Sequence, residues 1–126
     1  MIVGTIALFM WFFGGGGGAD TFRGELLRAL ELAPTAITET EQLHTVEEVL
    51  ERAVARIDTF DAELRTLRTE YVTLDQDYNS TPEQIEGALD RIDQAWGDLE
   101  KDMIDLRFEL REHVNAEQWS VLFPPP

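Results

Sequence analysis

The chain has no cysteine and a single lysine, and positive charge is scarce along its whole length. Without cysteine, neither a disulfide framework nor a thiolate metal site can form. Lys and Arg together number 10 against 25 Asp and Glu, which gives the 126 residues a formal charge of −15. This deficit argues against a nucleic-acid partner, because the neutralisation of phosphates requires clustered Lys and Arg.

The first 19 residues form an uncharged, mostly apolar segment. Residues 2–13 alone are shorter than the roughly 20 residues of a membrane span, but the glycines at 14–18 and Ala19 extend the run to nearly that length. We expect residues 1–19 to be a retained membrane anchor. A cleaved signal segment is the alternative, since Gly17, Gly18 and Ala19 form a small-residue cleavage pattern, although no charged residue precedes the apolar run.

The side of the membrane is less strongly indicated. Arg23 and Arg28 just after the segment favour a cytoplasmic body. An N-terminal apolar segment ahead of an acidic, cysteine-free domain favours export instead. We therefore expect a membrane-anchored protein whose body is extracytoplasmic, in the periplasm.

Residues 20–40 are predicted to form a juxtamembrane amphipathic helix followed by a linker. Phe22, Leu26, Leu30 and Ala33 share one face of this helix. Pro34 is predicted to end it.

Residues 41–123 carry the strongest pattern, two apolar seams with alternating three- and four-residue spacing, which is typical of a coiled-coil hairpin. An all-α fold is therefore predicted, with a short Pro tail at 124–126. The first seam comprises Leu43, Val46, Leu50, Ala53, Ile57, Phe60, Leu64, Leu67, Tyr71 and Leu74. The second comprises Ile85, Leu89, Ile92, Trp96, Leu99, Met103, Leu106, Leu110 and His113.

The break between the seams predicts a short loop and a well-marked helix start. Thr81 and Gln84 can form a capping box, with Pro82 at the first helical position. So short a loop requires the helices to return antiparallel. With Leu74 opposite Ile85, Leu43 lies near His113, and the open end of the hairpin is expected to face the anchor.

Two helices that each bury one seam make a thin core. Val54, Ile104 and Phe108 lie off the seams, and Trp119, Leu122 and Phe123 lie in the tail. We expect this end to be covered by the helix at 22–33 and the tail, or by a second copy. A protein partner or a homodimer is predicted on that ground.

No pattern of catalytic residues is present, and we expect no enzymatic activity. The predicted register brings both histidines to one end of the hairpin. His44 with Glu47, and His113 with Glu117, share helical faces and offer imidazole and carboxylate ligands to zinc, nickel, cobalt or copper. The alternative is that His113 is a polar seam residue and His44 is solvated.

The loop invites a second metal hypothesis, because oxygen-bearing side chains occupy the ligand positions of a calcium-binding loop. Ser80 replaces the glycine that the sharp turn needs, and a capped helix start accounts for the same residues. The candidate calcium ligands are Asp75, Asp77, Asn79, Thr81, Glu83 and Glu86.

Residues 37–123 resemble the Spy/CpxP-type periplasmic helical proteins and the related membrane-anchored heavy-metal sensors, which carry L-T-x-x-Q motifs. The stretch Val114-Asn115-Ala116-Glu117-Gln118 keeps the glutamine but has Asn in place of Thr, and residues 37–41 form a second, more divergent copy. The resemblance implies an all-α hairpin, an extracytoplasmic setting, and a role in chaperoning or in metal or stress sensing.

The sequence thus favours a membrane-tethered, extracytoplasmic helical hairpin that binds or senses, as a metal- or envelope-stress-responsive protein. The alternative is a single-span accessory subunit that docks onto a larger membrane complex. No cofactor is required by either function, beyond the divalent transition metal considered above.

Overall fold

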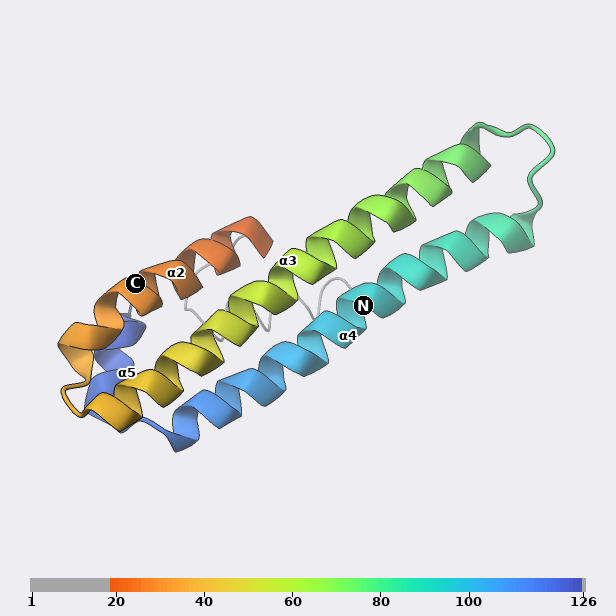
Figure 1. Cartoon of the computed structure of the whole chain (residues 1–126). Coiled ribbons are helices and arrows are strands. Elements are labelled where there is room, and N and C mark those ends of the chain that lie inside the picture. Colours follow the sequence, from red (N-terminus) through yellow and green to blue (C-terminus); the bar gives the residue numbers. More distant parts are fainter. Residues whose placement is uncertain (1–18, 126) are drawn as a thin grey trace.

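The computed structural model describes residues 19–125, which are helical throughout and contain no strand. There are four helices in this range: α2 (Ala19–Ala36), α3 (Thr40–Gln76), α4 (Pro82–Glu112) and α5 (Ala116–Leu122). Figure 1 shows α3 and α4 as two long antiparallel rods, with α2 and α5 gathered at one end. The all-α class and the long hairpin are therefore confirmed for the described residues.

The turn between the two rods forms as its sequence predicts. The Thr81 hydroxyl accepts a hydrogen bond from the Gln84 N–H at 3.2 Å, and the Gln84 side-chain oxygen accepts one from the Thr81 N–H at 2.9 Å. Pro82 occupies the first turn of α4, where its missing N–H has no helical partner to lose. Thus the capping box fixes the start of α4, and five residues separate it from the end of α3 at Gln76.

The register between α3 and α4 follows the predicted pairing of Leu74 with Ile85. Arg56 Nε lies 2.6 Å from Asp102 Oδ2 across the two helices. The Phe60 and Trp96 rings meet edge to face, with centroids 4.7 Å apart and an interplanar angle of 64°. Further ion pairs join Arg52 to Glu109 and Arg91 to Glu70. Because these pairs are largely solvent-exposed, they contribute to register more than to stability.

The α3 seam is confirmed in its first two-thirds, where Val46, Leu50, Ala53, Ile57, Phe60 and Leu64 are buried. The α4 seam differs from the prediction near the tip. Leu89 is 43 % exposed, whereas Ala88 and Ala95 are buried at 1 % and 2 %.

The other end of the α4 seam also differs from the prediction. His113 is exposed and lies beyond the last residue of α4, at its C-cap. Leu110 is the last buried residue of the seam. The helix ends before the predicted pattern does, so the imidazole is not a seam residue.

Helix α2 packs lengthwise against α3 through Phe22, Leu26, Ala29, Ala33 and the following Ile37, all buried. The predicted end at Pro34 is wrong, because α2 continues to Ala36. The Ile37 N–H still donates to the Ala33 carbonyl at 2.9 Å. A proline this close to the end of a helix forfeits one hydrogen bond, and burial of Ile37 outweighs that loss.

The direction of α2 is fixed by an ion pair with α3. Arg23, near the start of α2, forms an ion pair with Asp58 in the middle of α3, with Nε 2.8 Å from Oδ1. Helix α2 therefore runs antiparallel to α3, and its N-terminal end lies halfway along the hairpin (Figure 1). The chain enters α2 beside the middle of the rod, and not at the open end.

Helix α5 closes the end of the hairpin where α3 begins and α4 ends, which we call the base. It contacts α2, and Leu122 and Phe123 are buried in the shared core. The expectation that the helix near residue 22 and the tail cover this end is confirmed. The tail that covers this end is itself helical over Ala116–Leu122, which was not predicted from the sequence.

The opposite part of the hairpin, residues 61–95, we call the distal half. Within it the buried side chains are Leu64, Ala88 and Ala95, and two of these three are alanine. The remaining seam residues are half-buried or exposed. The hydrophobic core is therefore concentrated at the base.

Among residues 19–125, no helix combines the length and the apolar character that a bilayer span requires. The anchor or signal segment predicted for residues 1–19 lies outside the described residues, apart from Ala19, which begins α2.

Candidate functional site

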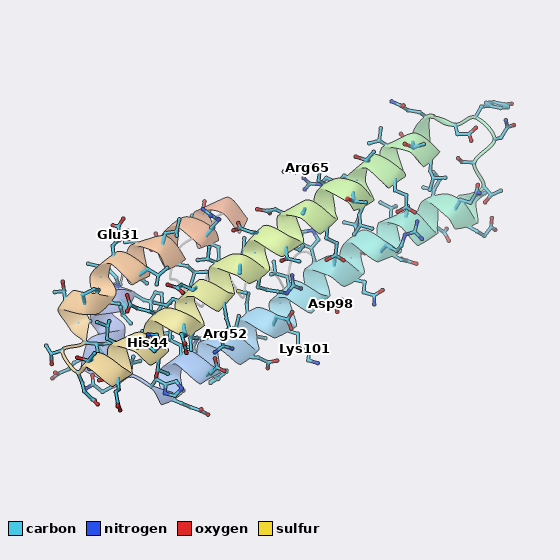
Figure 2. The ribbon with its side chains drawn as sticks, viewed as in Figure 1. Glu31, His44, Arg52, Arg65, Asp98 and Lys101 are labelled. Atoms are coloured by element: carbon cyan, nitrogen blue, oxygen red, sulfur yellow. The ribbon has the colours of Figure 1, made fainter. Side chains whose placement is uncertain are left out.

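His44, the first of the predicted transition-metal ligands, lies near the start of α3 and is exposed (Figure 2). Its Nε2 is 3.2 Å from Oε1 of Glu48, one residue beyond the predicted Glu47. Helical neighbours four apart lie close together, which accounts for this pairing. Such a pair supplies two ligands of the three or four that a zinc site needs.

His113 and Glu117, the other predicted ligands, lie at the junction of α4 and α5. The backbone carbonyl of His113 accepts a hydrogen bond from Gln42 Nε2 at 2.7 Å, so the ends of α3 and α4 do meet as predicted. Glu117 is exposed in the first turn of α5. Within residues 19–125, no group of three or more His, Asp or Glu side chains is placed to hold a metal ion. The transition-metal site stays a prediction.

The stretch that carries the family resemblance has a structural role at this junction. Asn115 Oδ1 accepts from the Gln118 N–H at 2.8 Å, and Gln118 Oε1 accepts from the Asn115 N–H at 3.0 Å, which is a second capping box. Gln42 Nε2 also donates to Gln118 Oε1 at 3.0 Å. These residues start α5 and attach it to the beginning of α3.

The side chains of the tip loop are engaged in holding the turn. Asp77 Oδ1 accepts from the Asn79 N–H at 2.9 Å, and the Ser80 hydroxyl donates to the Leu74 carbonyl at 2.6 Å. Two of the predicted calcium ligands, Asp77 and Thr81, thus serve the loop and the capping box. The others, Asp75, Asn79, Glu83 and Glu86, are exposed. Calcium binding here also stays a prediction.

A hollow of about 420 Å³ lies beside α5, lined in part by Arg107, Arg111 and Trp119. The Arg107 guanidinium carbon is 5.2 Å from the centroid of the Trp119 ring and 5.1 Å from that of Phe108, both within cation–π range. Burial lowers the pKa of Arg107, and the nearby charge of Arg111 lowers it further. The stacking helps to hold α5 against the last turns of α4.

The distal half presents a different kind of surface, because no helix among residues 19–125 covers the apolar side chains there. Val72 is 47 % exposed, Leu89 is 43 % exposed, and Tyr78 at the tip is 98 % exposed. Leu67, Tyr71, Leu74, Ile85 and Ile92 are half-buried. In an otherwise acidic chain, this surface is the strongest candidate for a functional contact.

A groove of about 500 Å³ runs along the α3 side of this surface. We call it the distal groove; its lining includes Asp61, Leu64, Arg65, Arg68 and Val72. This groove was not predicted from the sequence. The spacing of Asp61, Arg65, Arg68 and Val72, four, three and four residues apart, could have indicated a second face beside the seam.

The fold and the sites together define an all-α protein built on an antiparallel helical hairpin, with a closed base and an uncovered distal half. Comparison of the chain with models of protein families, with curated proteins and with solved structures finds no match.

Proposed function

We propose that this protein is a membrane-tethered, extracytoplasmic helical-hairpin protein that binds a partner protein along its distal half. The observation that carries the proposal is the contrast between the two halves. At the base, α2 and α5 cover the hairpin, and Leu50, Ile57 and Leu99 are at most 1 % exposed. In the distal half, apolar side chains of similar size remain partly exposed.

The contrast has a thermodynamic consequence. Covering a large apolar side chain contributes about 1.5–3 kcal/mol relative to leaving it in water. A partner that covers Val72, Leu89 and the half-buried residues between them would therefore gain several such contributions, reduced by the entropy lost on association. At the base most of the core is already formed by α2 and α5, and the apolar side chains still exposed outside the distal half are Leu27, Phe108 and Val121.

The tether and the compartment are supported by sequence alone. The uncharged run of residues 2–19 supports the anchor, and the acidic, cysteine-free body supports export. The proposed role is binding or sensing without catalysis, with a response to metal or envelope stress as its regulatory form.

Single cysteine substitutions test partner binding, because the chain has no cysteine of its own. A photo-crosslinker attached at Val72→Cys or Leu89→Cys, in membranes of the source organism, should give one defined protein adduct. Val121→Cys is a matched control, since Val121 on α5 is exposed to a similar extent, 41 % against 47 % for Val72. Equal adducts at residue 121, or none in the distal half, would contradict the proposal.

Two further measurements separate this proposal from the accessory-subunit alternative. After detergent extraction, comigration with a large complex on a native gel favours the subunit, and a free small species favours the binding protein. An intact mass that corresponds to an N-terminus at Asp20 would show that the first 19 residues are cleaved and would refute the tether.

A further inference from the structure

One face of α3 is covered by α2 at the base and continues uncovered into the distal half. Asp58 marks the boundary, where it pairs with Arg23 of α2. Asp61, Arg65, Arg68 and Val72 continue the same face toward the tip, since their spacing keeps them on one side of the helix. The distal groove is thus the extension of a surface that already accepts one helix.

The charge of this face changes sign along its length. At the base it carries Glu47, Glu51 and Asp58, and the helix that covers it supplies a cation, Arg23. Beyond Asp61 the charged residues on the face are Arg65 and Arg68. A helix that continues the line of α2 would therefore need acidic side chains where α2 has Arg23.

Arg65 and Arg68 differ from the two arginines that precede them in α3. Arg52 and Arg56, earlier in α3, form ion pairs with acidic residues of α4. Arg65 and Arg68 have no ion-pair partner within residues 19–125, although acids outnumber bases by 25 to 10 in the whole chain. Figure 2 shows Arg65 projecting from α3 on the side away from α4. Two exposed cations thus line the groove together with the exposed side chain of Val72, while Leu64 at its floor is buried.

We propose that the distal groove binds an amphipathic helix of another protein, with an apolar stripe that covers Val72 and acidic side chains that pair with Arg65 and Arg68. This inference rests on the proposed function and specifies the partner's chemistry. The N-terminal end of α2 lies at the near end of the groove and adds partial positive charge to it.

Two other occupants fit the chemistry less well. Residues 1–18 of this chain contain no acidic residue, so they cannot pair with the arginines. In a two-fold dimer through this face, the patch would meet its own copy. The arginines of one copy would then lie near those of the other, which opposes association.

Two synthetic peptides test the inference against the full chain. Both are stapled amphipathic helices of about four turns with the same apolar stripe; one has glutamates beside the stripe and its twin has lysines. A fluorescent label on each peptide reports binding by anisotropy at physiological salt. Because the chain carries a formal charge of −15, non-specific attraction favours the lysine peptide, so tighter binding of the glutamate peptide would identify a local basic site.

The matched pair of variants is Arg65→Glu/Arg68→Glu and Lys101→Glu/Arg111→Glu, which change the net charge equally. Lys101 and Arg111 also have no ion-pair partner within the described residues and lie outside the groove. The glutamate peptide should bind the groove variant roughly tenfold more weakly than the wild type and the control variant equally well. The lysine peptide should gain affinity for the groove variant.

The results distinguish this inference from the function on which it rests. The inference of an acidic helix is refuted if the lysine peptide binds the wild type more tightly than the glutamate peptide does. It is also refuted if the two variants lose equal affinity for the glutamate peptide. If the distal crosslink at Val72→Cys persists in that case, partner binding stands with a different chemistry. A wild-type dimer in sedimentation that Arg65→Glu/Arg68→Glu dissociates makes a second copy the occupant and overturns the inference as stated.

Discussion

The substitution Phe60→Ala probes the core near the middle of the hairpin. The Phe60 ring is fully buried, and it meets Trp96 edge to face at 4.7 Å. Loss of a buried phenylalanine costs about 3–5 kcal/mol, which includes lost apolar burial and the cavity left behind. A folded body of roughly 100 residues has about 5–15 kcal/mol of stability, so the variant should lose about a fifth of it or more.

The assay is urea denaturation followed by far-ultraviolet circular dichroism, with Val72→Ala as the comparison. Val72 is 47 % exposed in the distal half, so its truncation should cost less than about 1 kcal/mol. Trp96→Ala and the double variant complete a cycle, in which the ring pair should show a coupling of about 0.5–1.5 kcal/mol. A cost for Phe60→Ala no greater than that for Val72→Ala would refute the contrast between base and distal half.

Four further predictions follow from the same structure. Backbone amides of residues 67–76 and 82–92 should exchange with deuterium faster than those of residues 46–60 and 99–110, because little core covers them; uniform protection along both rods would contradict this. Thr81→Ala should lower stability by about 1 kcal/mol through loss of the cap. The melting temperature in millimolar Ca²⁺ should equal that in chelator, because Asp77 and Thr81 are engaged in the turn. A higher melting temperature in Ca²⁺ would support the calcium site. Calorimetric titration with Zn²⁺ or Ni²⁺ tests the other site: wild-type protein should bind where His44→Ala/His113→Ala does not, and identical traces remove it.

The antiparallel pairing of α3 with α4 could be predicted because it depends on two regular apolar repeats. Two apolar seams and one capped turn determine the antiparallel pairing, and the contact between Phe60 and Trp96 follows from the resulting register. The finer detail near the tip could not be predicted in the same way. The alternating spacing places Leu89 in the seam, but the structure buries Ala88 and Ala95 and leaves Leu89 exposed.

The ends of the helices and the candidate sites were harder to predict. Pro34 is a helix breaker by local rules, yet the packing of Ile37 carries α2 past it. Asn115 and Gln118 were interpreted as part of a family motif, although their spacing also fits a capping box. The register placed both histidines at the base, but it could not specify their side-chain directions. The distal groove lies beyond the N-terminal end of α2, and no pattern within α3 predicts where that end lies.

The contact between α2 and α5 joins nearly the first and nearly the last described residues of the chain. During synthesis, α3 can pair with α4 as soon as both have left the ribosome, because their contacts begin at a short turn. The base must wait for Leu122 and Phe123, which follow both rods in the chain. Until then the apolar face of α2 lacks part of its cover, and we expect nascent or truncated chains to require a chaperone more than the finished protein does.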